Sequence, residues 1–280
     1  MELLSLLPLW YQYLLVGVFG LIIGSFLNVY IYRLHTGRSL QGSSHCLSCG
    51  TPLKWYELVP VVSYLVLRGR CRTCSSYIPF RYVLVELLTA ALFVLEFYLH
   101  GLSLLFMPAL LLLALLVVVA VYDLYHLIIP DELVVALAAA GLLLVGLSVD
   151  TGWSAQTGQL LLQHIGAALA AAGFYASLWW FSHGRWIGFG DVKLAFPLGL
   201  VVGLPAVFSF IVLSFWVGAI LSVLYMLIVQ GLKRGQPYLS FHFVPLTIKS
   251  EVPFAPFLII AFLIVWWFDL SVLTLFVNLV

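Results

Sequence analysis

Residues 104–122 read LLFMPALLLLALLVVVAVY, a stretch without a charged side chain that ends at Asp123. A transmembrane helix needs about 20 predominantly apolar residues, so this stretch predicts a helix that crosses a membrane. The whole chain has the same character, because 64% of its 280 residues are hydrophobic and only 8% are charged. Soluble globular proteins contain about 25% charged residues. The composition therefore excludes an ordinary soluble protein and predicts one that lies in a lipid bilayer.

Further stretches without Asp, Glu, Lys or Arg predict the other spans. The interval from Leu194 to Leu232 is long enough for two helices, and the segment Gly203-Leu204-Pro205 supplies a turn between them. The first apolar stretch has no basic segment before it, so we interpret it as a spanning helix and not as a signal peptide. We expect an all-α polytopic membrane protein with about eight transmembrane helices, at residues 10–32, 82–99, 103–122, 131–149, 160–182, 191–203, 206–230 and 254–276.

The basic residues predict the topology of these spans. With eight helices, the loops 33–81, 123–130, 183–190 and 231–253 fall on one side of the membrane. All 12 Lys and Arg residues lie in these loops or at their edges: Arg33, Arg38, Lys54, Arg68, Arg70, Arg72, Arg81, Arg185, Lys193, Lys233, Arg234 and Lys249. Because loops rich in Lys and Arg stay in the cytoplasm, this side is predicted to be cytoplasmic. The net charge of +1 gives no argument for nucleic acid, and we expect no nucleic-acid partner.

The four cysteines of the chain form two CxxC motifs, Cys46/Cys49 and Cys71/Cys74, within the loop 33–81. Two such motifs can supply four thiolates to one tetrahedral Zn²⁺. In a secreted chain the same cysteines would indicate two disulfides, but a cytoplasmic loop is reducing. A loop this short has little core of its own, so a metal could hold it folded. We therefore predict a structural zinc in a zinc-ribbon-like domain at 33–81, between a first helix at 1–32 and a membrane domain at 82–280.

Two aspartates, Asp123 and Asp191, lie at the predicted cytoplasmic ends of spans. Ionisable residues at such positions mark function more often than packing. Two adjacent carboxylates share a proton, so one can activate water while the other protonates a substrate carbonyl. Gly188 and Gly190 leave space beside Asp191 for a substrate backbone. The alternative is that Asp191 only caps a helix. A third acid, Asp131, follows Pro130, and we interpret it as an acid in the first turn of a helix.

Polar and small residues in the first two spans have simpler interpretations. Gly20 and Gly24 form a GxxxG pattern, which favours close packing of helices. Asn28 and Glu86 are expected to bond neighbouring helices, although Glu86, near the cytoplasmic end of its span, could also belong to a site.

Five ordered blocks make the chain resemble the bacterial prepilin peptidases. They are Gly24-Ser25-Phe26-Leu27-Asn28-Val29, the cysteine motifs with Leu67-Arg68-Gly69-Arg70-Cys71, the block Val85-Glu86-Leu87-Leu88-Thr89-Ala90, Asp123 with Ile129-Pro130-Asp131, and Gly188-Phe189-Gly190-Asp191-Val192-Lys193-Leu194. The match runs across most of the chain. Leu47 and His35 stand where the family often has proline, which leaves the cysteines intact.

The resemblance implies an aspartic endopeptidase of the bacterial plasma (inner) membrane, with Asp123 and Asp191 as the catalytic pair at the cytoplasmic face. It implies prepilin or pseudopilin substrates, each cut after a glycine between a short basic leader and an apolar helix. It further implies N-methylation of the new amino terminus from S-adenosylmethionine. No residue can be assigned to that methylation from the sequence, which has no G-x-G-x-x-G motif after a strand.

Three alternatives remain at this stage. A transporter would place acids at mid-depth in repeated halves, whereas these acids lie at one face. A presenilin-like protease would share the Gly-x-Gly-Asp motif but would not need the cysteine loop. A peptidase without methylation is the third, and the intact cysteines argue against it. The individual pilin substrate, the secretion or pilus system, and self-association stay open.

Overall fold

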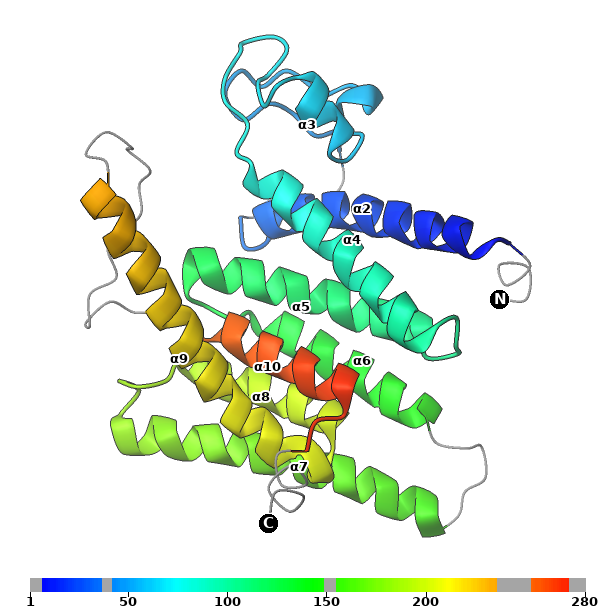
Figure 1. The fold of residues 1–280 in the computed structure, drawn as a ribbon, viewed down its shortest axis with the longest axis vertical. Helices are drawn as coiled ribbons and strands as arrows, with labels where there is room; N and C mark the ends of the chain where they lie inside the picture. The colour runs from blue at the N-terminus through cyan, green and yellow to red at the C-terminus, as the bar shows by residue number, and fades with distance from the viewer. Residues whose placement is uncertain (1–6, 37–41, 149–154, 236–252, 272–280) are drawn as a thin grey trace. The chain divides into compact units, whose positions relative to one another are not determined.

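The computed structural model describes residues 7–36, 42–148, 155–235 and 253–271, and these residues form helices and loops without a strand (Figure 1). The all-α fold is therefore confirmed. The elements are α2 (Leu9–Arg33), η1 (Trp55–Glu57), α3 (Val62–Val66), α4 (Arg81–His100), α5 (Phe106–His126), α6 (Asp131–Ser148), α7 (Ala155–Ser182), α8 (Phe189–Val202), α9 (Leu204–Gly235) and α10 (Ala255–Phe268). The predicted loops at 149–160 and 231–253 lie partly outside the described residues.

Among the residues that the structure describes, six helices are long and apolar enough to cross a membrane: α2, α4, α5, α6, α7 and α9. The protein is therefore a multi-pass membrane protein. Helices α8 and α10 have 14 residues each, which at 1.5 Å per residue gives about 21 Å and falls short of a hydrocarbon core of about 30 Å. That these two helices also cross stays a prediction. The predicted break is confirmed, because α8 ends at Val202 and α9 begins at Leu204.

The chain divides into two compact units, residues 1–122 and residues 123–280. The helix α5 crosses this division and continues to His126, so Asp123 lies inside the helix and not at its end as the sequence suggested. The division expected from the sequence, with boundaries after residues 32 and 81, stays a prediction.

In the first unit, α2 packs against α4 through two glycines (Figure 1). A Cβ atom on Gly20 would lie 2.6 Å from the Cα of Ala90, and one on Gly24 would lie 2.7 Å from the Cα of Glu86. Non-bonded carbon atoms do not come this close, so only glycine at these two positions allows the backbones of α2 and α4 to approach. The close packing predicted from the GxxxG pattern is confirmed.

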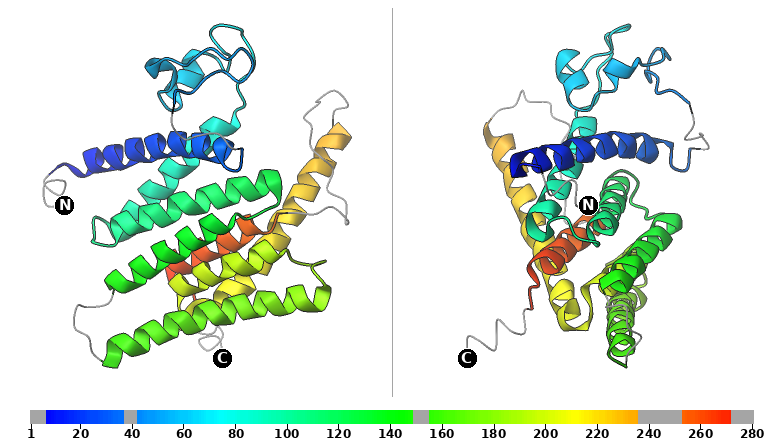
Figure 2. Two further views of the ribbon diagram at one scale, coloured as in Figure 1. Left: turned by 180° about the vertical axis from the view of Figure 1, so that it is seen from behind. Right: turned by 90° about the vertical axis from the view of Figure 1, so that its right-hand side faces the viewer.

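In the second unit, α8 is enclosed by α6, α7, α9 and α10 (Figure 2). Its contact with α7 depends on small residues, because a Cβ atom on Gly199 would lie 2.8 Å from the carbonyl oxygen of Ala167 and 2.8 Å from the Cβ of Ala171. Both alanines are fully buried. This enclosure holds the first turn of α8, and with it Asp191, in a fixed place.

Candidate active site

Asp123 lies in the last turns of α5 and is only 5% exposed. Its Oδ2 accepts a hydrogen bond of 3.3 Å from the backbone N–H of Ala255, the first residue of α10. The first N–H groups of a helix have no partner within the helix and carry a partial positive charge. The start of α10 therefore both fixes the Asp123 carboxylate and stabilises its negative charge.

Asp191 lies in the first turn of α8 and is 7% exposed. The N-cap of α8 is Gly188, which has an extended backbone, and the N–H of Asp191 donates to the Gly188 carbonyl at 3.2 Å. The alternative that Asp191 caps the helix is therefore wrong.

The two carboxylates face one cavity of about 230 Å³, and their negative charges repel each other. The structure thus brings together two acids that the sequence could only place at the same depth. The other residues that line the cavity come from the α5–α6 loop and the start of α8: Leu127, Ile128, Ile129, Gly188, Phe189, Gly190 and Lys193.

The glycines beside Asp191 have different roles. A Cβ atom on Gly190 would lie 3.2–3.3 Å from three carbon atoms of Ile129, whereas one on Gly188 would meet the Oδ2 of Asp191 at an ordinary 3.5 Å. Gly190 therefore lets α8 approach the α5–α6 loop. The expectation that both glycines leave room for a substrate backbone stays a prediction. Sequence reasoning missed Ile129, which carries no recognisable signal.

Asp131 has different surroundings from the two buried acids. It begins α6, its side chain is 76% exposed, and it forms an ion pair with Lys193 of α8. It is not among the residues that line the cavity. The interpretation of Asp131 as a first-turn acid is confirmed.

The two CxxC motifs fold into matching turns. In the first, the N–H of Gly50 donates to the Cys46 carbonyl at 2.9 Å; in the second, the N–H of Ser75 donates to the Cys71 carbonyl at 2.9 Å. Gly50 and Ser75 both have a positive φ, of 71° and 57°. The chain therefore presents the four sulfur atoms from two similar turns, as zinc knuckles do.

The four Sγ atoms lie within 4.8 Å of one another, and those of Cys46 and Cys74 are 3.8 Å apart. A tetrahedral zinc with Zn–S distances of 2.3 Å separates its sulfur atoms by about 3.8 Å. Hydrogen bonds from the backbone N–H groups of Cys49 and Ser48 lower the pKa of the Cys46 thiol to about 6. Because the thiolate is the form that binds metal, the cluster can hold a metal ion.

Comparisons with known proteins match both units. Residues 18–100 match the Bacterial Peptidase A24 N-terminal domain, and residues 110–223 match the Type IV leader peptidase family. Proteins named "Prepilin leader peptidase/N-methyltransferase" are similar over most of their length. Those of Legionella pneumophila (29% identity, 96% of each chain), Xanthomonas campestris (33%, 86% of each) and Bacillus subtilis (30%, 94% of this chain and 96% of the relative) are examples. No solved structure matches the chain significantly. The chain belongs to the type IV leader peptidase family.

Proposed function

We propose that this membrane enzyme cleaves the leader of type IV prepilin-like substrates with Asp123 and Asp191, and that it then methylates the new amino terminus. Both activities are those that the names of its relatives give. The observation that carries the assignment of the acids is that both buried carboxyls face one cavity.

The two carboxyls can perform hydrolysis without a covalent intermediate. One carboxylate takes a proton from water as the water oxygen attacks the scissile carbonyl carbon, and the protonated partner donates its proton to the carbonyl oxygen. The C–N bond then breaks, and the released amine takes up a proton. Two negative charges that face one cavity repel each other, so a state with one proton on the pair is favoured, which is the state this division of roles requires.

The rim of the cavity suits an apolar substrate next to a membrane. Leu127, Ile128 and Phe189 line the cavity and yet are 49%, 62% and 52% exposed. Such side chains can contact the apolar helix of a prepilin or pseudopilin on the C-terminal side of the cut. By the positive-inside rule, the basic loops and this cavity face the cytoplasm of a bacterial inner membrane.

The cysteine cluster would hold one Zn²⁺ through Cys46, Cys49, Cys71 and Cys74. With four sulfur ligands such a site is closed, so the metal supplies folding energy to the loop and takes no part in hydrolysis.

Cleavage of a prepilin by purified variants tests the assignment. Asp123→Asn and Asp191→Asn should each abolish cleavage, and the double variant should be no worse than either single one, since residues that act as a unit are non-additive. Asp131→Asn is the matched control. It removes an ion pair that is exposed on the Asp131 side and is worth about 0–1 kcal/mol, and it leaves both buried acids in place, so it should keep substantial activity.

Product masses report cleavage, and circular dichroism with zinc content reports folding. Robust cleavage by Asp191→Asn would refute the proposal. An inactive Asp131→Asn beside an active Asp123→Asn would move the catalytic role to Asp131.

A further inference from the structure

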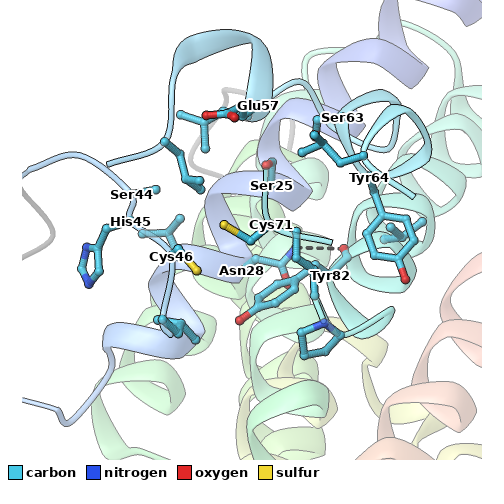
Figure 3. Close-up of a pocket in the computed structure, with 18 of the residues that line it drawn as sticks. Ser25, Asn28, Ser44, His45, Cys46, Glu57, Ser63, Tyr64, Cys71 and Tyr82 are labelled. Atoms are coloured by element: carbon cyan, nitrogen blue, oxygen red, sulfur yellow. Dashed lines mark hydrogen bonds between the residues drawn. The ribbon is translucent and has the colours of Figure 1, made fainter. Parts of the chain in front are cut away.

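The first unit contains a second cavity, of about 240 Å³, which the peptidase mechanism does not use (Figure 3). It lies among the cytoplasmic end of α2, the cysteine loop and the start of α4. Ser25 and Asn28 line it from α2, Tyr64 lines it from the loop, and Tyr82 lines it from α4. Its volume approaches the range of small-molecule sites, roughly 300–1,000 Å³.

The wall of this cavity contains a buried carboxylate, Glu86 of α4, which is 7% exposed. Its Oε2 accepts a hydrogen bond of 2.7 Å from the backbone N–H of Val61, and Ser25 also bonds the carboxylate. On the other side, Gly24 brings the backbone of α2 close to the Cα of Glu86. The carboxylate is thus held between α2 and the loop that contains Val61.

Val61 adopts a costly conformation to make this contact. Its φ is 60°, which is rare and unfavourable for a β-branched residue. Residues in such conformations persist where the surrounding structure holds them, and they gather at ligand sites. A strained loop residue aimed at a buried acid is therefore a second sign of a built site.

The lining carries charges of both signs, from Glu57 and Glu86 and from Arg33 and Arg72, with aromatic rings beside them. Four tyrosines line the cavity: Tyr32, Tyr64, Tyr77 and Tyr82. Aromatic faces and carboxylates recognise organic cations. A methylation from S-adenosylmethionine brings together two of them, the sulfonium of the donor and the ammonium of the new amino terminus.

Neither of the other nearby glutamates can take the place of Glu86. Glu57 also lines the cavity, but its carboxylate accepts the backbone N–H of Lys54 at 2.8 Å within its own turn. Glu96 is buried on the same helix, but it lies about 15 Å further along the axis and pairs with His100 at 3.0 Å.

We propose that this cavity binds S-adenosylmethionine and that Glu86 receives the proton of the substrate's amino terminus during methyl transfer. This inference rests on the proposed function. The ammonium of the cut pilin gives a proton to the Glu86 carboxylate, and the free amine attacks the methyl carbon. The methyl–sulfur bond breaks and its electron pair stays on sulfur. The products are the N-methylammonium, neutral S-adenosylhomocysteine and protonated Glu86, so charge and atoms balance.

The experiment separates cleavage, methylation and binding in the full-length, zinc-loaded protein. Product masses distinguish cut from cut and methylated pilin, and equilibrium dialysis with radiolabelled S-adenosylmethionine measures binding. Glu86→Gln should lower the methylation rate at least 100-fold while cleavage continues. Tyr64→Leu, which removes an aromatic face and keeps an apolar side chain, should weaken binding about 5- to 30-fold. Glu96→Gln is the matched buried control and should change neither binding nor methylation.

Each contrary result has a distinct meaning. Methylation at the parent rate by Glu86→Gln, or unchanged binding by Tyr64→Leu, would overturn this inference and leave the proposed function intact. Cleavage lost together with methylation in a folded Glu86→Gln would also overturn it, because the acid would then serve the whole enzyme. A parent protein that cuts no prepilin would instead refute the proposed function.

Discussion

Gly190→Ala should slow cleavage without unfolding the protein. The added Cβ would lie 3.2–3.3 Å from three carbon atoms of Ile129, whereas carbon atoms in good contact are about 3.5–4.0 Å apart. Ile129 is 5% exposed and lies in the loop that follows the helix of Asp123. The loop must therefore move by a few tenths of an ångström, and this displaces Asp123 relative to Asp191.

The size of the effect follows from the cost of overpacking, which is typically about 1–3 kcal/mol. If the displaced acids raise the activation free energy of cleavage by this amount, kcat/KM drops about 5- to 150-fold. The assay is the initial rate of cleavage of a prepilin peptide over a range of concentrations. Gly146→Ala, where nothing lies within 4 Å of the added Cβ, is the control and should stay within about twofold of the parent.

A second substitution tests the cause. Ile129→Val removes one of the three contacting carbon atoms, so the variant Gly190→Ala/Ile129→Val should recover part of the lost activity. Such a coupling is what contacting residues show in a double-mutant cycle. A Gly190→Ala variant with the kcat/KM of the parent would refute the reasoning. So would a double variant whose kcat/KM is lower than the two single losses, multiplied together, predict.

Two further predictions concern the loop and the topology. Purified protein should contain about one zinc per chain, and Cys46→Ser with Cys74→Ser should abolish zinc binding and expose the loop to limited proteolysis; stoichiometric disulfides without metal in fresh protein would contradict this. Single cysteines placed between residues 149 and 160 should react with an impermeant maleimide in intact cells, whereas cysteines near residue 40 or 235 should not; labelling near residue 40 from outside would invert the topology.

Much of the fold follows from the sequence alone. In a bilayer every backbone polar group must be satisfied within the chain, so a long apolar stretch has to be helical. Charge-free intervals therefore predicted each long helix to within a few residues at most ends. The CxxC spacing likewise predicted the cysteine cluster, because two short turns can each present two sulfur atoms without help from distant residues.

The tertiary structure alone decided how the sites are assembled. The length of an apolar stretch indicates which segments cross a membrane but not which helices meet, because contact between helices in lipid depends on small residues that fit one another. The shared cavity of Asp123 and Asp191, the bond from Ala255 and the contact of Gly190 with Ile129 each join segments far apart in the chain. Glu86 shows the same limit, since its place beside the strained Val61 comes from the packing of a loop onto a helix, which no local pattern encodes.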